Sequence, residues 1–377
     1  MKGGRLAIRG CSQKKSNSLW SLPDEMVVKC LAHLSRLDLA AFAMTSQRHR
    51  CLVDSSELCD LRWEMGCIEA SLFVCLHFPP ETSPRWFIFH PVQRRLRPIY
   101  PRLGQSLSSS FVKIDRGIFV IGGSIKGDPT AEVWFLDCFK HTWYRIPPMK
   151  MPRVFPSASL IDGKIYVFGG LRDNAADPSN WAEVFDLKTR TWEFLFVSTP
   201  KTIFQNVVID NKELYAVDKD GQVLSFSPSK LGGTFVACEK TDHSMPRYRN
   251  DWCLIGTLLF CRAFDTLWWC EPSELDWKQV KGLEEELPHP KDWGFYITKV
   301  FTNSAGNIVI LWHTHPRGLL DNLDLWCAEV SVEKRMGSSE LELWGKFEWA
   351  SAVVGLLDYL PVAFEIHVLY ADYVLVV

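Results

Sequence analysis

The stretch GKIYVFGG, residues 163–170, reads as a turn, a short strand of β-branched and aromatic residues, and then a pair of glycines. The same pattern occurs earlier as RGIFVIGG, residues 116–123, at an offset of 47 residues. Each copy is followed by an aspartate that lies six residues before a tryptophan, namely Asp137 with Trp143 and Asp186 with Trp192. A repeat of this length has room for four short strands and therefore predicts a β-propeller.

Weaker copies of the pattern follow along the chain. NKELYAV (211–217), GTLLFCRAFDTLWW (256–269) and GNIVILW (306–312) keep the turn and the alternating strand but have no glycine pair. The glycine pair, the aspartate and the tryptophan together resemble kelch repeats. The resemblance implies that the glycines allow close backbone approach and positive φ angles, and that the tryptophans pack between blades.

A proline followed by a basic residue recurs just before each expected first strand. The offsets between successive copies are 51, 48, 46 and 44 residues. Pro361 marks a sixth such position, although Val362 replaces the basic residue. The five copies are Pro101-Arg102, Pro152-Arg153, Pro200-Lys201, Pro246-Arg247 and Pro290-Lys291.

The remaining strand patterns lie at the two ends of the repeat region. Residues 71–100 supply strands two to four of one blade, and residues 363–377 supply its innermost strand. Six blades result, closed by pairing of the two ends, and closure removes the exposed edge of an open sheet. The predicted fold is a small all-α head followed by an all-β kelch-type propeller. The expected domains are a disordered tail (1–18), a helical domain (19–66) and the propeller (67–377).

Residues 21–66 have a helical period instead. Val27, Cys30, Leu31 and Leu34 fall at i, i+3, i+4 and i+7, which predicts an amphipathic helix. A second helix is expected from Ser35, where Asp38 follows three residues later, and a third within SSELCDLRWEMG, ending at Gly66. Three or so short helices enclose little core unaided.

This head resembles an F-box over roughly residues 20–65. The matching positions are Leu22-Pro23-Asp24-Glu25, Cys30-Leu31, Leu34, Arg36, Leu39 and the segment 45–55. Together with the repeats, the arrangement is similar to plant F-box/kelch-repeat proteins along nearly the whole chain. One departure is that His49 and Arg50 stand where many F-boxes carry a tryptophan.

The resemblance implies a substrate receptor of an SCF-type ubiquitin ligase. In such a complex the F-box binds the Skp adaptor, which joins the cullin scaffold, and the propeller holds an unidentified target protein. We expect the adaptor to bind an apolar helix face that the small domain cannot cover. Two alternatives stay open: this face packs against the propeller, or the protein is a kelch scaffold outside any ligase. The expected adaptor-binding residues are Leu22, Pro23, Val27, Leu31 and Leu34.

For the target, the strand order places the Pro-basic loops and the loops after the glycine pairs on one rim. These long loops are residues 124–130, 171–181 and 313–322. One hypothesis is a positive collar at the channel mouth that selects an acidic, phosphorylated or carboxylate-bearing target. The alternative is that each basic residue pairs with a neighbouring carboxylate or carbonyl and only joins the blades. The collar residues are Arg102, Arg153, Lys201, Arg247 and Lys291.

Charge and composition limit the other function classes. The chain has 377 residues, and 42 Lys and Arg nearly balance 44 Asp and Glu, so no nucleic-acid or membrane partner is expected. No signal peptide or transmembrane run is found, which predicts a cytoplasmic location, a nuclear location or both. The 12 cysteines show no CxxC spacing and are interpreted as buried thiols. They include Cys51, Cys59, Cys67, Cys75, Cys253 and Cys261.

No catalytic chemistry is expected. The sequence holds no GxSxG, P-loop, GxGxxG or HExxH motif, and it predicts no cofactor and no metal. His313 and His315 form an HxH pair, which is interpreted as exposed on a loop. A propeller enzyme with a small-molecule pocket is the least favoured class, and a ligand in the central channel that controls target capture is a further alternative.

Overall fold

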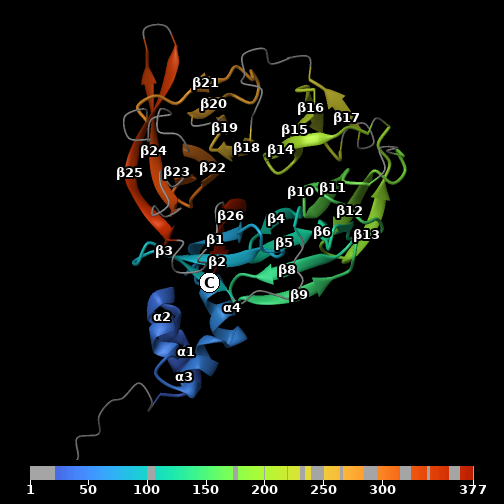
Figure 1. Cartoon of the computed structure of the whole chain (residues 1–377). Coiled ribbons are helices and arrows are strands. Elements are labelled where there is room, and N and C mark those ends of the chain that lie inside the picture. Colours follow the sequence, from blue (N-terminus) through green and yellow to red (C-terminus); the bar gives the residue numbers. More distant parts are fainter. Residues whose placement is uncertain are drawn as a thin grey trace, which may run out of the picture. The chain divides into compact units, whose positions relative to one another are not determined.

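The computed structural model divides the chain into two compact units, a helical unit that runs through Glu69 and a strand unit from Ala70 to Val376 (Figure 1). The predicted tail, residues 1–18, lies outside the described residues. The structure describes residues 22–99, 107–172, 177–198, 200–218, 220–229, 234–238, 250–263, 266–283, 295–314, 324–337, 340–355 and 366–376.

The helical unit has four helices where the sequence predicted three. The serines Ser35, Ser46 and Ser55 cap three of them, each accepting a hydrogen bond from the backbone N–H three residues on. The unpredicted helix lies within residues 45–55, a segment that is too polar to show an apolar period. The helices are α1 (Asp24–Ala32), α2 (Arg36–Ala43), α3 (Gln47–Val53) and α4 (Ser56–Glu64).

The strand unit contains six four-stranded antiparallel sheets, and this confirms the predicted six-bladed propeller. In each blade the innermost strand is named first. Blade 1 is β26 (His367–Val376), β1 (Glu69–His77), β2 (Arg85–His90) and β3 (Arg95–Ile99); blade 2 is β4 (Ser110–Ile114), β5 (Gly117–Ile121), β8 (Val133–Asp137) and β9 (Thr142–Ile146); blade 3 is β10 (Ser157–Ile161), β11 (Lys164–Phe168), β12 (Ala182–Asp186) and β13 (Thr191–Leu195). Blade 4 is β14 (Ile203–Ile209), β15 (Glu213–Asp218), β16 (Val223–Phe226) and β17 (Phe235–Ala237); blade 5 is β18 (Asn250–Ile255), β19 (Leu258–Ala263), β20 (Thr266–Cys270) and β21 (Lys278–Gln279); blade 6 is β22 (Phe295–Thr302), β23 (Ile308–Thr314), β24 (Asp324–Met336) and β25 (Leu341–Gly355).

The two ends of the strand unit meet in blade 1. The C-terminal strand β26 pairs with β1, so that the last strand of the chain is the innermost strand of the first blade. This is the predicted closure. The innermost strands β26, β4, β10, β14, β18 and β22 contact one another in that order, and β22 contacts β26 again to complete the ring (Figure 1).

Tryptophans fill the spaces between blades, as the repeat predicted. Trp192 of blade 3 packs in a cluster with Val112 and Ile121 of blade 2, and its indole Nε1–H donates to the Pro147 carbonyl at 2.8 Å. Trp143 of blade 2 meets Trp86 of blade 1 edge to face, with ring centroids 5.7 Å apart. These tryptophans therefore belong to the core and not to a ligand site.

The outer hairpin of blade 6 is longer than any strand pair that the sequence indicated. β24 and β25 are 13 and 15 residues long and stay paired from Asp324 with Gly355 to Met336 with Leu341. Near the far end, Lys281 of the preceding blade bridges to Trp344 in parallel. The hairpin thus extends blade 5 beyond its short outer strand β21 (Figure 1).

The described cysteines are all free thiols. Cys59, Cys75 and Cys261 are buried, as predicted, whereas Cys51 is exposed on α3 because that short helix buries none of its residues. Among the described residues no helix has the length and apolar content needed to cross a membrane.

The glycine pairs have the predicted conformation and contacts. Gly169 and Gly170 adopt φ angles of 66° and 76°, which other residues rarely adopt. A Cβ atom on Gly170 would lie 2.8 Å from the Val154 carbonyl oxygen, which is closer than van der Waals contact. In the earlier pair, a Cβ on Gly122 would lie 2.7 Å from the Arg153 carbonyl oxygen. Glycine is needed at both positions because the loop that leads into β10, the innermost strand of blade 3, passes directly over Gly122 of blade 2 and Gly170 of blade 3.

Two matched substitutions test this requirement. Gly163, in the turn between β10 and β11, has a similar φ of 71°, but a Cβ atom on it would have no neighbouring atom within 4 Å. Gly163→Ala is expected to cost about 1 kcal/mol, through backbone strain alone. Gly170→Ala should cost about 2 kcal/mol more, because the added methyl group meets backbone. Urea unfolding of the two variants measures the difference, and equal losses would contradict the close-approach explanation.

Candidate functional site

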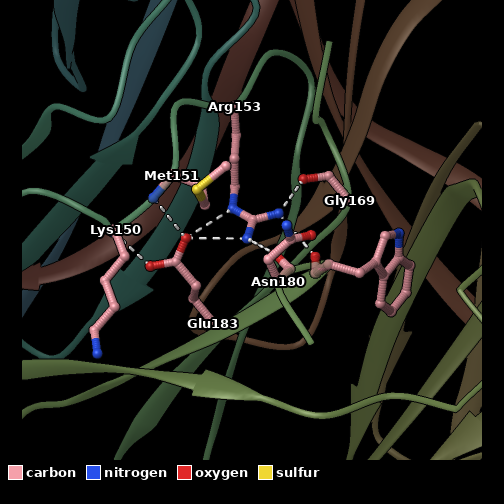
Figure 2. A network of polar contacts seen from close by, with 7 residues as sticks. Lys150, Met151, Arg153, Gly169, Asn180 and Glu183 are labelled. Atoms are coloured by element: carbon pink, nitrogen blue, oxygen red, sulfur yellow. Dashed lines mark hydrogen bonds and ion pairs between the residues drawn. The ribbon is translucent and has the colours of Figure 1, made fainter. Parts of the chain in front are cut away.

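A buried polar network surrounds Arg153, the basic residue of one Pro-basic loop (Figure 2). Its side chain is fully buried and pairs with Glu183 of β12, with 3.0 Å between Nη2 and Oε1. The guanidinium also donates to three carbonyl oxygens of the loop between β11 and β12. These belong to Gly169 (2.6 Å), Trp181 (2.8 Å) and Asn180 (2.7 Å). Arg153 therefore closes the two ends of that loop against each other.

The same network joins two blades. The Glu183 carboxylate also accepts from the backbone N–H groups of Lys150 and Met151, at 2.6 and 3.0 Å. The backbone of Arg153 pairs with blade 2, because its N–H donates to Thr130 O and its carbonyl accepts from Gly123 N. Burial lowers the pKa of the Arg153 guanidinium, and the neighbouring Glu183 charge opposes that effect. The ion pair is therefore a structural clamp between blades 2 and 3.

Lys201 makes the corresponding contact in blade 4. Its ammonium group lies 3.1 Å from Asp218 at the end of β15 and 2.6 Å from the side-chain oxygen of Gln222. Blade 4 has no glycine pair, and the buried carboxylate of Asp218 takes the place of the carbonyl that Arg153 reaches in blade 3. In both blades the basic residue thus holds the loop between the second and third strands.

These contacts correct part of the collar hypothesis. Arg153 cannot present its charge to a target because its side chain is enclosed and its donors are used within the fold. Lys201 is 35% exposed, but its charge is paired with Asp218. For Arg153 the alternative holds, in which the basic residue joins parts of the propeller, whereas target binding by Lys201 stays a prediction. Three predicted collar residues lie outside the described residues, namely Arg102, Arg247 and Lys291.

A pocket of about 420 Å³ opens on the same rim, beside the Arg153 network. It is formed by the Pro-basic loop and by the loops after the two glycine pairs, so these loops share one rim, as the strand order predicted. The pocket itself was not predicted, because it depends on side chains from three separate loops. Its lining residues are Asp128, Pro129, Met151, Pro152, Leu171, Arg172 and Asn180.

The polar and charged groups of the pocket differ in how they are paired. Arg172 and Asp128 form an ion pair at 3.3 Å, and both side chains are largely exposed. The Oδ1 atom of Asn180 is buried and has no hydrogen-bond partner among the described residues. A buried amide oxygen without a partner costs free energy, and a bound ligand that supplies a donor would remove that cost.

Charged side chains of neighbouring innermost strands form ion pairs. Asp251 of β18 binds Lys299 of β22 and also Arg262, and Asp372 of β26 binds Lys113 of β4. Burial alone would raise the pKa of Asp251, but the two cations outweigh it and lower that pKa. Burial raises the pKa of Asp372 despite Lys113. These pairs link blade 5 to blade 6 and blade 1 to blade 2, so they contribute to ring closure.

The histidine pair expected on a loop is placed differently. His313 lies on β23 and is buried, because β23 continues through the position where the sequence indicated a loop. His315 lies outside the described residues. Within the described ranges no three His, Cys, Asp or Glu side chains gather in a way that would hold a metal ion.

The structure of the helical unit corrects the prediction that Val27 and Leu31 bind the adaptor. Val27 and Leu31 are buried in the core of the unit itself, together with Leu39 of α2 and Leu58 of α4. The sequence analysis underestimated this core because α4 shows only a weak apolar period. Leu34 is half-buried against the same cluster. Leu22 and Pro23 remain exposed at the start of α1.

Other exposed apolar residues of the helical unit were missed in the sequence. Met26 on α1 is 46% exposed, Leu37 on α2 is 38% exposed, and Met44, directly after α2, is 77% exposed. The sequence signal was available, since Met26 lies one helical turn after Leu22 and off the buried face. Large apolar side chains gathered on one small unit are typical of a surface that binds a partner.

The Arg153 clamp can be compared with the exposed ion pair on the same rim. Arg153→Met leaves the Glu183 carboxylate buried and unpaired, and we expect a loss of about 3–5 kcal/mol of unfolding free energy. Arg172→Met should have little effect, because the Arg172–Asp128 pair is exposed to solvent. Chemical denaturation measures both. Adding Glu183→Gln to Arg153→Met should recover part of the loss, and similar stabilities for the two single variants would argue against a clamp.

Comparisons with known proteins agree with the two units. The F-box domain family matches residues 19–61, and the FKB95 kelch-repeats domain family matches residues 88–354. The putative F-box/kelch-repeat protein At3g46050 of Arabidopsis thaliana is 33% identical over 356 residues, covering 91% of this chain and 90% of that protein. The putative F-box/kelch-repeat protein At4g39290 of the same plant is 30% identical over 360 residues, covering 88% of this chain and 91% of that protein. Four short helices, a six-bladed kelch propeller and these matches show that the chain belongs to the F-box/kelch-repeat family.

Proposed function

We propose that this protein is the substrate-recognition subunit of an SCF ubiquitin ligase. Its F-box binds a Skp-family adaptor and through it a cullin scaffold, and its propeller binds a target protein for ubiquitination, in the cytoplasm, the nucleus or both. The observation that carries the proposal is the presence of an F-box and a kelch propeller in one chain, the combination of SCF substrate adaptors in general. The protein itself acts by binding and not by catalysis.

The exposed apolar side chains of the helical unit support the adaptor-binding part. Leu22, Met26 and Leu37 stay exposed although the unit closes its own core around Leu31 and Leu58. Exposing them costs solvation free energy unless a partner covers them. An apolar helix surface that enters a partner's groove is a common mode of recognition. The surface to test is therefore the exposed part of α1 and α2 and not the buried face that the sequence suggested.

The rim of the propeller supports the target-binding part. Loops from blades 2 and 3 meet there around a pocket, and the Arg153 clamp fixes the loops that line it. Loops held by a rigid scaffold are the usual place for recognition in propellers and related folds. A kelch scaffold outside any ligase would use the same rim, and only adaptor binding separates the two functions.

Co-elution of the full chain with a purified Skp-family adaptor tests the proposal. The Leu22→Glu/Met26→Glu double variant places charge on the exposed part of α1 and should abolish the complex without unfolding the unit. Met65→Glu is the matched control, since Met65 is 39% exposed at the end of α4, and it should retain the complex.

Two results would reject the adaptor role. One is the absence of a complex with the folded wild-type chain, which would favour the scaffold outside a ligase. The other is equal binding by the wild type and the double variant, which would place the adaptor on a different surface. Circular dichroism of each variant shows that the helical unit stays folded.

A further inference from the structure

We propose that the rim of blades 2, 3 and 4 binds an extended, uncharged segment of the target protein. The segment inserts an apolar side chain into the pocket beside Arg153, pairs a main-chain amide with Asn180, and packs against Phe155 and Phe204. This inference rests on the proposed function in one respect: the bound segment is taken to be the part of the target that the ligase recognises.

Phe155 is exposed by a strained backbone. Its side chain is 75% exposed, and its φ angle of 49° is one that bulky residues rarely adopt. Pro156 follows, and a residue before proline normally takes an extended conformation. Such strain persists only where neighbours impose it, and it is concentrated at functional sites.

The neighbours that impose the conformation of Phe155 are the repeat elements themselves. The Phe155 N–H donates to the Ser108 carbonyl of blade 2 at 2.9 Å. The preceding Val154 N–H donates to the Gly170 carbonyl at 2.7 Å, an approach that the missing Cβ of Gly170 permits. The glycine pair and the preceding blade 2 therefore hold Phe155 outward, although burial of the ring would stabilise the fold.

Phe204 is exposed by a different irregularity at the corresponding place in blade 4. A β-bulge lies between Ile203 and Gln205 of β14, so Phe204 is the inserted residue, and it is 66% exposed. Bulges commonly redirect a side chain next to a functional site.

Hydrogen bonds fix the register between the two innermost strands. The Asn206 amide donates to Ser157 Oγ at 2.6 Å, and its oxygen accepts from Ser159 Oγ at 2.6 Å. Phe155 and Phe204 each lie two residues before these linked positions, at the same end of neighbouring strands. Two unrelated backbone irregularities thus expose an aromatic ring at equivalent positions on one rim.

The pocket indicates what the ligand contains. Pro129, Met151, Pro152 and Leu171 form an apolar lining, and about 420 Å³ accommodates one or two side chains rather than a folded surface. The Asn180 amide offers an acceptor and a donor side by side, the pattern that a peptide main chain complements. Its Oδ1 is buried and has no partner among the described residues, so a peptide N–H that displaces the atoms covering this oxygen would satisfy it.

Charge pairing argues against an acidic or phosphorylated segment. Arg153 is neutralised by Glu183, Lys201 by Asp218, and Arg172 by Asp128. A phosphate bound to any of these three cations would have to break its pair, and breaking the Arg153–Glu183 pair would leave a buried carboxylate unpaired. An uncharged segment keeps all three pairs intact.

Selection from a library of random linear peptides on the immobilised full-length chain tests the inference. We expect the enriched peptides to lack net charge and to share one aromatic or long aliphatic residue. The affinity of an enriched peptide is then measured by fluorescence anisotropy. Asn180→Leu, Phe155→Gly and Phe204→Ala should each weaken it roughly tenfold or more. Tyr144→Ala, at an exposed aromatic residue of β9, should leave it unchanged.

Phe155→Gly separates recognition from folding. Glycine adopts the positive φ angle without strain, so the variant should have an equal or higher Tm while it loses peptide affinity. Three results would each overturn the proposal. The selection enriches acidic peptides, it enriches no peptide at all, or the three rim variants bind the enriched peptide as tightly as the wild type does. These outcomes do not depend on the adaptor: a lost Skp complex would refute the ligase role alone, and an intact Skp complex with no rim effect would refute this site alone.

Discussion

The pairing of β26 with β1 is the constraint on which the propeller depends. It joins strands separated by almost the whole repeat region into one blade, so that blade 1 has four strands like the other five. Every innermost strand then has a neighbour on both sides, and the Lys113–Asp372 and Lys299–Asp251 contacts reinforce that ring across two of the blade boundaries. This closed ring also fixes where each loop at the rim begins and ends, including the loops that we assign to target recognition.

Within the ring, the kelch repeat residues act as a connected set. The positive φ angles of Gly169 and Gly170 let the chain before β10 approach closely, and Arg153 in that chain ties the next loop to Glu183. The same approach holds Phe155 in its strained, exposed conformation. Residues that look purely structural in the repeat therefore position the side chains that we assign to target binding. The loop before β10 therefore has two effects: it stabilises the fold through the Arg153–Glu183 ion pair, and it exposes the side chain of Phe155.

The sequence predicted the architecture well because the strands and turns of each blade follow local sequence patterns. Glycine pairs, alternating strands and the tryptophans Trp143 and Trp192 sufficed for six blades and their closure. The site was predicted poorly, because it depends on which partner each side chain finds. Arg153 looked like a free cation until Glu183, thirty residues away, was placed beside it, and Val27 looked uncovered until α4 supplied Leu58. Phe204 is exposed by a bulge that no periodic pattern reveals.

The central claim is that one chain connects a ligase to a target through two separate surfaces. Ubiquitin transfer by a reconstituted Skp–cullin–RING ligase to a reporter protein that carries a rim-binding peptide tests it most directly. The account predicts transfer that requires this chain and is lost both with charge on the exposed face of α1 and with glycine at Phe155. Transfer that survives both changes, or no transfer although adaptor and peptide are both bound, would contradict it.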